Sequence, residues 1–298
     1  MSDSVVILMP TFDRYRWLAS FTERYLDHWW PSHPPVWRCG LSQPEHERDL
    51  PLENDPRDWI GIARSAAHAL AKRGVHACYI VLDDMPPIGS CHAEHLDKTI
   101  PRWLDELGAA CIGLHGWGQG CVPANGGIDA QRLGLEHVPA DFRCRFSLHP
   151  TLWRLPALVD LLDALAGHEE MKKRSAWAFE RRADETLATP AGRWSANAYR
   201  VCGDRMTSSD YAIRNAFRLE LSRRLVGGLN ALAIRYGTSA LREACANGMC
   251  AVYRNYAGPY PLVHSGLMTA GKPNPHFVHF MRRQGDRAML EEFLRTIP

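Results

Sequence analysis

Hydrophobic and polar positions in the first half of the chain follow two alternating patterns: short unbroken apolar runs, and longer stretches with apolar residues at helical spacing. Unbroken runs are typical of strands buried on both faces, whereas the helical spacing predicts helices with one buried side. The predicted strands cover residues 5–9, 36–40, 79–82 and 109–114, and the predicted helices cover residues 14–30, 56–73 and 91–107. Strands that alternate with helices predict right-handed βαβ units and a mostly parallel sheet.

The second half of the chain has a less regular pattern. It predicts strands at residues 143–149, 197–202 and 249–253, a helix at 156–166, another helix that begins at 175, and a mainly helical segment at 208–247. A long glycine-rich loop joins the two halves at residues 113–127, and loops of that length are usually functional or mobile. The whole pattern predicts an α/β protein with a helical segment inserted toward its C-terminus.

Two adjacent carboxylates, Asp83 and Asp84, end the apolar run 79–82, and Pro86 and Pro87 follow them. The prolines prevent the strand from continuing, so both carboxylates are expected at the carboxyl edge of a central strand, where open α/β sheets bind ligands. Hard oxygen ligands in that position suit Mg²⁺ or Mn²⁺, which can hold a diphosphate. The alternative is an ordinary strand-to-turn junction, where Asp is common for its turn hydrogen bonds.

Composition narrows the class of protein. The chain has 298 residues, 46% of them hydrophobic and 23% charged, and a formal net charge of +2, which gives no reason to expect a nucleic-acid partner. Its nine cysteines include no CxxC pair, which favours reduced thiols. The sequence contains neither an apolar run of the ~20 residues that a membrane span needs nor a signal peptide. A soluble intracellular protein is therefore expected.

The end of the first predicted strand carries Pro10, Thr11, Asp13 and Arg14. A hydroxyl, a carboxylate and a guanidinium at this point could contact a nucleotide: Asp13 would bind a base or ribose, and Arg14 would bind a phosphate. The alternative is that Thr11 or Asp13 caps the helix that follows.

Glu180 follows Trp177 and Phe179 at the start of a predicted helix. A carboxylate beside these aromatic side chains would be poorly hydrated, which raises its pKa and suits a general base near neutral pH. The alternative is a structural Glu that the helix dipole stabilises in the first turn.

Near the C-terminus, a turn-rich segment contains His264, which could complete a metal site, and Lys272, which could meet a phosphate. A lone His in such a loop is more often a surface residue. Two other motifs are set aside. The glycines at 116–120 have the wrong spacing for a dinucleotide fingerprint, and Cys91 with His95 supplies too few ligands for a structural zinc site.

Four segments in this order resemble GT-A glycosyltransferases of the bacterial cell-surface polysaccharide type. They are residues 9–14 (MPTFDR), 79–84 (YIVLDD), 146–154 (FSLHPTLWR) and 177–180 (WAFE). The last two are similar to the family signatures S-L-Q-x-x-x-W-R and P-W-x-F-E. The resemblance covers roughly residues 5–202 and continues faintly at 260–272, whereas residues 208–247 have no counterpart.

The resemblance implies one GT-A-like domain over residues 1–298, with a mostly parallel, mixed sheet flanked by helices. Residues 1–128 would form the nucleotide-binding half, and residues 129–298, with the helical insertion 208–247, would form the acceptor-side half. It implies transfer of a sugar from a nucleotide-diphosphate sugar, with uridine as the expected nucleotide, to a glycan or lipid-linked acceptor. The enzyme would be cytoplasmic or at the inner face of the membrane. Aromatic patches such as Trp29-Trp30 could make a peripheral contact there, but such patches are more often part of the core.

The resemblance also assigns roles to the candidate residues. Asp84 and His264 would bind Mg²⁺ or Mn²⁺, Glu180 would deprotonate the acceptor in an inverting reaction, and the remaining residues would line the donor and acceptor sites. The donor residues would be Pro10, Thr11, Asp13, Arg14, Asp83 and Lys272, and the acceptor or sugar pocket would contain His149, Trp153 and Trp177.

The chain departs from the family pattern at three positions. Leu82 stands where relatives often carry an acid, Ala176 replaces a proline, and His149 replaces a glutamine. Two other readings therefore stay open: a catalytically silent nucleotide-sugar-binding or scaffold protein, supported by Leu82, and a metal-dependent phosphoester hydrolase that uses the same strand edge.

Overall fold

The computed structural model describes most of the first half of the chain and separate parts of the second half. The described residues are 4–51, 55–114, 122–123, 135–138, 145–167, 175–187, 198–201, 232, 259–262, 266–269, 271–274, 277–278, 281–282 and 286–298. Among them, no helix has both the length and the apolar character needed to cross a membrane.

The described strands form a nine-stranded mixed sheet in the order β3-β2-β1-β4-β8-β5-β9-β7-β6. Its strands are β1 (Val5–Pro10), β2 (Val36–Leu41), β3 (Asp49–Pro51), β4 (Ala77–Ile80), β5 (Cys111–Gly113), β6 (Val122–Pro123), β7 (Leu135–His137), β8 (Thr151–Arg154) and β9 (Ala198–Val201). β1 to β4 are parallel, whereas β8 is antiparallel to both β4 and β5, and β7 is antiparallel to β9 and β6. The predicted α/β class, with a mostly parallel but mixed sheet, is confirmed.

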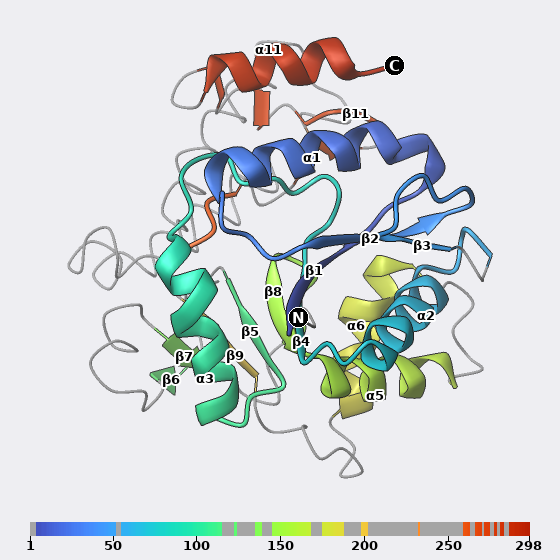
Figure 1. The fold of residues 1–298 in the computed structure, drawn as a ribbon, viewed down its shortest axis with the longest axis vertical. Helices are drawn as coiled ribbons and strands as arrows, with labels where there is room; N and C mark the ends of the chain where they lie inside the picture. Colours follow the sequence, from blue (N-terminus) through green and yellow to red (C-terminus); the bar gives the residue numbers. More distant parts are fainter. Residues whose placement is uncertain are drawn as a thin grey trace.

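Helices cover both faces of this sheet (Figure 1). On one face lie α2 (Trp59–Lys72), α5 (Leu155–Ala166) and α6 (Ala176–Leu187), and on the other lie α1 (Arg16–Trp29) and α3 (Ile100–Glu106). Successive residues of β1 therefore enter different cores: Val6 and Leu8 pack with α2 and α5, whereas Ile7 and Met9 pack with α1 and α3. A strand covered on both sides has no polar face, which explains its unbroken apolar run.

The C-terminal part of the chain adds a further layer outside α1. Helix α11 (Arg287–Thr296) runs along the outer side of α1 (Figure 1). Phe293 packs with Phe21, and Glu292 accepts hydrogen bonds from Arg24 and from the hydroxyl of Tyr25. A short antiparallel hairpin, β10 (Met268–Thr269) and β11 (Lys272–Pro273), precedes this helix.

Most of the predicted elements are present, but three differ. The strand predicted at 143–149 is wrong, because residues 145–150 form bends and the strand, β8, begins only at Thr151. Side chains in this stretch bond to the nearby backbone instead of leaving it free for a ladder: the amide of His149 donates to the Ser147 hydroxyl, and Thr151 donates to the His149 carbonyl.

The second difference is that β4 ends at Ile80, so Asp83 and Asp84 lie in the turn beyond the strand. The third is that a π-helical turn, η2 (His95–Thr99), interrupts the helix predicted at 91–107. Pro101 follows this turn and has no N–H with which to continue regular helical bonding. Neither β3 nor α11 is anticipated by the sequence patterns.

Some predictions fall elsewhere. The strand at 249–253 and, apart from Leu232, the helical segment 208–247 lie outside the described residues. Trp30 is fully buried, and its indole nitrogen donates to Asp97 Oδ1 at 2.7 Å. It therefore cannot supply the membrane contact considered for the Trp29-Trp30 patch.

Candidate functional site

The sheet topology brings the ends of several strands to one edge. Parallel β1, β4 and β5 all finish there, and antiparallel β8 begins there, because Thr151 pairs with Ile80 on one side and with Gly113 on the other. The residues just after Ile80 and those just before Thr151 are consequently neighbours across the edge. This is the position at which open α/β sheets bind ligands.

Thr11, directly after β1, holds the first carboxylate. Its hydroxyl donates to Asp83 Oδ2 at 2.7 Å, and its side chain is only 1% exposed. Its backbone N–H donates to the Cys39 carbonyl, so the ends of β1 and β2 stay together. Gly40 permits this approach, because its φ is +97° and a Cβ there would lie 2.2 Å from the Thr11 carbonyl oxygen.

Asp83 and Asp84 are poorly hydrated and close to each other. Burial, reinforced by the charge of Asp84, raises the pKa of Asp83 to about 7 despite the hydrogen bond from Thr11. Burial also raises the pKa of Asp84 to about 6. No cationic side chain among the described residues lowers either pKa. The two carboxylates therefore supply several oxygen ligands, and no positively charged side chain among the described residues compensates their charge.

Residues from near the C-terminus cover Asp84. The Leu267 N–H donates to the Asp84 carbonyl at 2.8 Å, and the side-chain amide of Asn274 donates to the Gly266 carbonyl at 2.8 Å. Gly266 has a φ of +71°, and a Cβ at this position would lie 2.4 Å from Asp84 Oδ2. Tyr260 anchors the same region by donating its hydroxyl to the Met85 carbonyl. Only a glycine at 266 fits against the carboxylate in this arrangement.

Glu180 lies on α6 and is held by one of its two oxygens. Its Oε1 accepts a hydrogen bond from the Leu148 N–H at 2.8 Å and another from the Ser147 hydroxyl at 3.1 Å. Phe179, the preceding residue, is fully buried against Trp59 and Trp153, which fixes this turn of the helix. The structure thus brings Glu180 to the loop that leads into β8, on the same sheet edge as the Asp pair.

The same loop holds His149. Its Nδ1 lies 2.6 Å from Ser147 Oγ, so a single hydroxyl contacts both His149 and Glu180. His149 and Glu180 are both partly exposed. Sequence reasoning placed His149 in a pocket but missed Ser147, although this serine opens the S-L-H stretch matched to the family signature.

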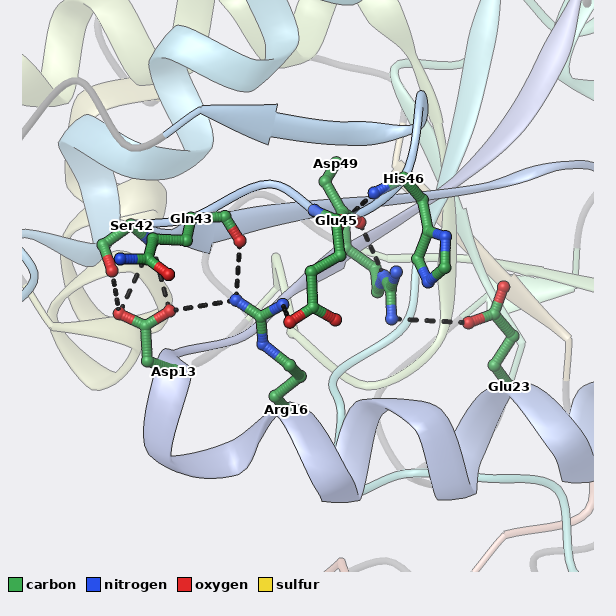
Figure 2. Close-up of polar contacts among 9 residues, drawn as sticks. Asp13, Arg16, Glu23, Ser42, Gln43, Glu45, His46 and Asp49 are labelled. Atoms are coloured by element: carbon green, nitrogen blue, oxygen red, sulfur yellow. Dashed lines mark hydrogen bonds and ion pairs between the residues drawn. The ribbon is translucent and has the colours of Figure 1, made fainter.

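Asp13, two residues after Thr11 at the end of β1, has structural partners in the loop after β2 (Figure 2). Asp13 Oδ2 accepts from the Ser42 hydroxyl at 2.5 Å, and this bond is the main reason that the pKa of Asp13 lies below its usual value. Arg16 bridges Asp13, the Gln43 carbonyl and Glu45. Arg14 lies over the Tyr15 ring, 4.6 Å from its centre. Asp13 therefore anchors the loop after β2, and contacts of Asp13 and Arg14 with a donor stay predictions.

Two aromatic residues of the predicted pocket have opposite surroundings. Trp153 is fully buried between Phe146 and Phe179, so its predicted place in a sugar pocket is wrong. Leu152, which precedes it on β8, is buried in the core on the opposite face of the sheet. Trp177 is 71% exposed and precedes Glu180 by three residues, which places both on one side of α6.

The remaining candidates are Pro10, Lys272 and His264. Pro10 is buried as the last residue of β1. Lys272 is exposed beside the turn of the β10–β11 hairpin, whereas Gly266 lies just before that hairpin. His264 lies outside the described residues. The donor and metal roles of these residues stay predictions.

Asp83 and Asp84 fit a divalent cation by their chemistry. Mg²⁺ is commonly bound by one or two carboxylates, with water and substrate phosphates as the other ligands. Desolvated carboxylates with raised pKa values gain most from a nearby cation. In the described part of the chain, no group of three or more His, Cys, Asp or Glu residues is arranged around a common point.

Comparison with known proteins gives little beyond this. No family model matches the chain, and no curated protein matches it. Among solved structures, the chain is similar to the crystal structure of a glycosyltransferase involved in the glycosylation of the major capsid of PBCV-1. The identity is 10%, the match covers 73% of this chain and 98% of that chain, and the TM-score is 0.34. A likeness at that TM-score carries no argument about function, so the chemistry rests on the residues described above.

Proposed function

We propose that the chain is an inverting glycosyltransferase that moves a sugar from a nucleotide-diphosphate sugar to an acceptor hydroxyl with the help of Mg²⁺ or Mn²⁺. The observation that carries the proposal is the presence, on one sheet edge, of two desolvated aspartates and a glutamate that is fixed by a single oxygen. The motifs that resemble GT-A glycosyltransferases contain the same three carboxylates.

Asp84, supported by Asp83, is the proposed metal ligand. The bound cation would stabilise the negative charge that develops on the departing nucleotide. Thr11 keeps one oxygen of Asp83 fixed, which orients the pair toward the ligand edge of the sheet. Pro10, Asp13, Arg14 and Lys272 are proposed to line the donor site, with uridine as the expected nucleotide.

Glu180 is the proposed general base. Its Oε1 is occupied by the Leu148 and Ser147 donors, whereas within the described residues no hydrogen bond is assigned to Oε2. Oε2 can therefore accept the proton of the acceptor hydroxyl. The hydroxyl oxygen then attacks the anomeric carbon from the side opposite the nucleotide. A base fixed in this way contributes typically 10²–10⁴-fold to the rate.

Trp177 is the proposed platform for a sugar of the acceptor. It is exposed and shares one side of α6 with Glu180, so a ring stacked on its indole would have its hydroxyls close to the base. The acceptor is proposed to be a glycan or a lipid-linked sugar, met in the cytoplasm or at the inner face of the membrane.

Titration calorimetry with a panel of nucleotides and nucleotide sugars, with and without Mn²⁺, tests the proposal. We expect one nucleotide to bind the wild-type protein only when metal is present, and Asp84→Asn to lose this binding. Asp160→Asn is the matched control, because Asp160 is an exposed carboxylate on α5, outside the candidate site. Circular dichroism of each variant checks that it is folded.

Two results would count against the transferase. Absence of binding across the whole panel would favour a scaffold protein that keeps this fold for another purpose. Metal-dependent binding accompanied by hydrolysis of simple phosphoesters, without sugar transfer to any acceptor, would favour the hydrolase.

A further inference from the structure

We propose that Ser147 and His149 are positioning residues for Glu180. They form a series of hydrogen bonds that run in one direction, from the imidazole Nδ1–H to the Ser147 hydroxyl and from that hydroxyl to Glu180 Oε1, which orients the carboxylate and leaves Oε2 for the acceptor. This inference rests on the proposed function, because these hydrogen bonds orient Glu180, the proposed base.

The direction of the hydrogen bonds follows from counting protons. An ionised carboxylate can only accept, so across the 3.1 Å contact the Ser147 hydroxyl must donate to Glu180 Oε1. That donation uses the single proton of the hydroxyl. Across the 2.6 Å contact, Ser147 Oγ can then only accept, and Nδ1 of His149 must carry the proton.

Ser147 Oγ is fully used in this arrangement. A hydroxyl oxygen has one proton and two lone pairs. Here the proton goes to Glu180, one lone pair accepts the Nδ1–H of His149, and the other accepts the backbone N–H of His149 at 3.2 Å. Since the proton and both lone pairs of the hydroxyl have partners, the hydroxyl cannot rotate to another partner without losing a hydrogen bond.

The backbone of the loop is fixed as firmly as its side chains. Phe146 and Leu148, which alternate with the two positioning residues, are buried in the core beneath the site. The Thr151 hydroxyl donates to the His149 carbonyl at 2.7 Å, and the Leu148 N–H donates to the same Oε1 of Glu180. The donors are thus preorganised before any substrate binds, as electrostatic positioning requires.

The arrangement fixes the tautomer of His149. A neutral imidazole that carries its proton on Nδ1 has none on Nε2, so Nε2 is a hydrogen-bond acceptor in this site. The side-chain N–H of a glutamine can also donate to a serine hydroxyl. A His149→Gln variant should therefore retain the hydrogen-bond direction, whereas His149→Ala should abolish it.

Nitrogen NMR of the protein without substrates tests the hydrogen-bond chain directly. With ¹⁵N-labelled histidine, the His149 signals are assigned as those that disappear in His149→Gln. We expect neutral wild-type His149 to carry its proton on Nδ1, Ser147→Ala to shift the population toward Nε2–H, and Ser147→Thr to restore it. Ser175→Ala, at the start of the same helix α6, is the matched control and should leave the tautomer unchanged.

Sugar transfer gives the second readout. Ser147→Ala should lower kcat by about 10-fold, the factor that one hydrogen bond to a charged group contributes. The KM for the donor should change little, and Ser147→Thr and His149→Gln should each retain most of kcat. An effect confined to overall stability would lower these quantities together and would not be rescued by the conservative variants.

The outcomes separate this inference from the proposed function. A wild-type His149 with its proton on Nε2, unaffected by Ser147→Ala, overturns the inference whether or not the protein transfers sugar. A correct tautomer combined with an unchanged kcat in Ser147→Ala also overturns it, because the hydroxyl would then not serve the base. Failure to bind any nucleotide in the calorimetric panel rejects the transferase but leaves the NMR test valid.

Discussion

The carboxylates at the two sides of the candidate site are held in opposite ways. All three carboxylates are partly exposed. Desolvation raises the pKa values of Asp83 and Asp84, Thr11 donates a hydrogen bond to Asp83 alone, and Gly266 lies directly against Asp84. Glu180 receives two donors on one oxygen. Asp83 and Asp84 have no cationic partner among the described residues, whereas Glu180 accepts two hydrogen bonds.

The difference indicates two chemical tasks. Desolvated carboxylates with few donors gain most when a cation arrives, so the aspartates suit metal binding. A carboxylate that is oriented by fixed donors, with one oxygen left for a partner, suits proton transfer. Variants that remove one side of this contrast, or increase it, test the assignment.

Replacing the base should have the largest effect. Glu180→Gln keeps the size and the Oε1 contacts of the side chain but cannot take a proton, so kcat should fall by about 10²–10⁴-fold. Donor binding, measured by calorimetry, should be unchanged. Glu291→Gln, on the exposed side of α11, is the control for a Glu-to-Gln change away from the site. Transfer at the normal rate in Glu180→Gln would show that Glu180 is not the base.

A clash introduced at the close contact with Asp84 should have the next largest effect. Gly266→Ala places a methyl group against the carboxylate and also strains the backbone, and we expect a loss of roughly 2–3 kcal/mol in the free energy of unfolding. The amide of Leu267, which donates to Asp84, should also lose protection from hydrogen exchange.

Gly271→Ala is the matched control for this change. Gly271 lies in the same segment with a φ of +75°, but no atom of the described residues lies within 4 Å of the added Cβ. It should therefore show only the backbone strain, about 1 kcal/mol. Equal losses in the two variants would mean that contact with Asp84 is unimportant.

The raised pKa values predict a pH effect of a definite sign. Unfolded Asp titrates near 3.9, whereas in the folded protein the pKa is about 7 for Asp83 and about 6 for Asp84. Between these limits the folded protein binds more protons, so this pair makes the metal-free protein less stable as the pH rises from about 4 to about 7.

Comparison of wild-type protein with Asp83→Asn isolates this contribution. The variant should gain stability relative to wild type between pH 5 and pH 8, by an amount on the order of 1–2 kcal/mol. Urea denaturation at each pH measures the difference. Under the metal proposal, Mn²⁺ should stabilise the wild-type protein more at pH 8 than at pH 5, because protons compete for the same oxygens. A difference that does not change with pH would mean that Asp83 titrates normally.

Loss of the Thr11 hydroxyl should have the smallest effect. Thr11→Val leaves Asp83 without its side-chain donor and should cost about 1 kcal/mol at pH 8, where Asp83 is ionised, and less at pH 5. Thr11→Ser keeps the hydroxyl, so its cost should be the same at both pH values. Identical pH dependence in the two variants would exclude a role for this hydrogen bond.

The spacing of apolar residues correctly predicted those helices and strands that depend mainly on their own local sequence. α1, α2, α5 and α6 have clear apolar sides, and β1 is an unbroken apolar run between turn residues. β2 is a mainly apolar run that contains Arg38. The start of β8 was missed for a physical reason. An apolar stretch does not show where hydrogen bonding between strands begins, and here Ser147 and Thr151 use their side chains to bend the backbone before the ladder starts.

The candidate site was predictable where a residue type alone suggests chemistry. Asp83, Asp84 and Glu180 stand out in the sequence, and the sheet topology places all three at one edge. Trp153 was misplaced because a sequence motif does not tell a buried aromatic residue from an exposed one. The contact of Gly266 with Asp84 joins residues far apart in the chain, and no local pattern announces such a contact.

The position of β8 between β4 and β5 has a consequence for the order in which the protein can be assembled during synthesis. β1 and β4 can pair once the first third of the chain has left the ribosome, but the strand that separates β4 from β5 and brings Ser147 to the edge is made later. The cover over Asp84 comes later still, with Gly266, and α11 is translated after it. The nascent sheet therefore exposes an unpaired β4 edge while translation continues, which is the stage at which the chain is most open to aggregation.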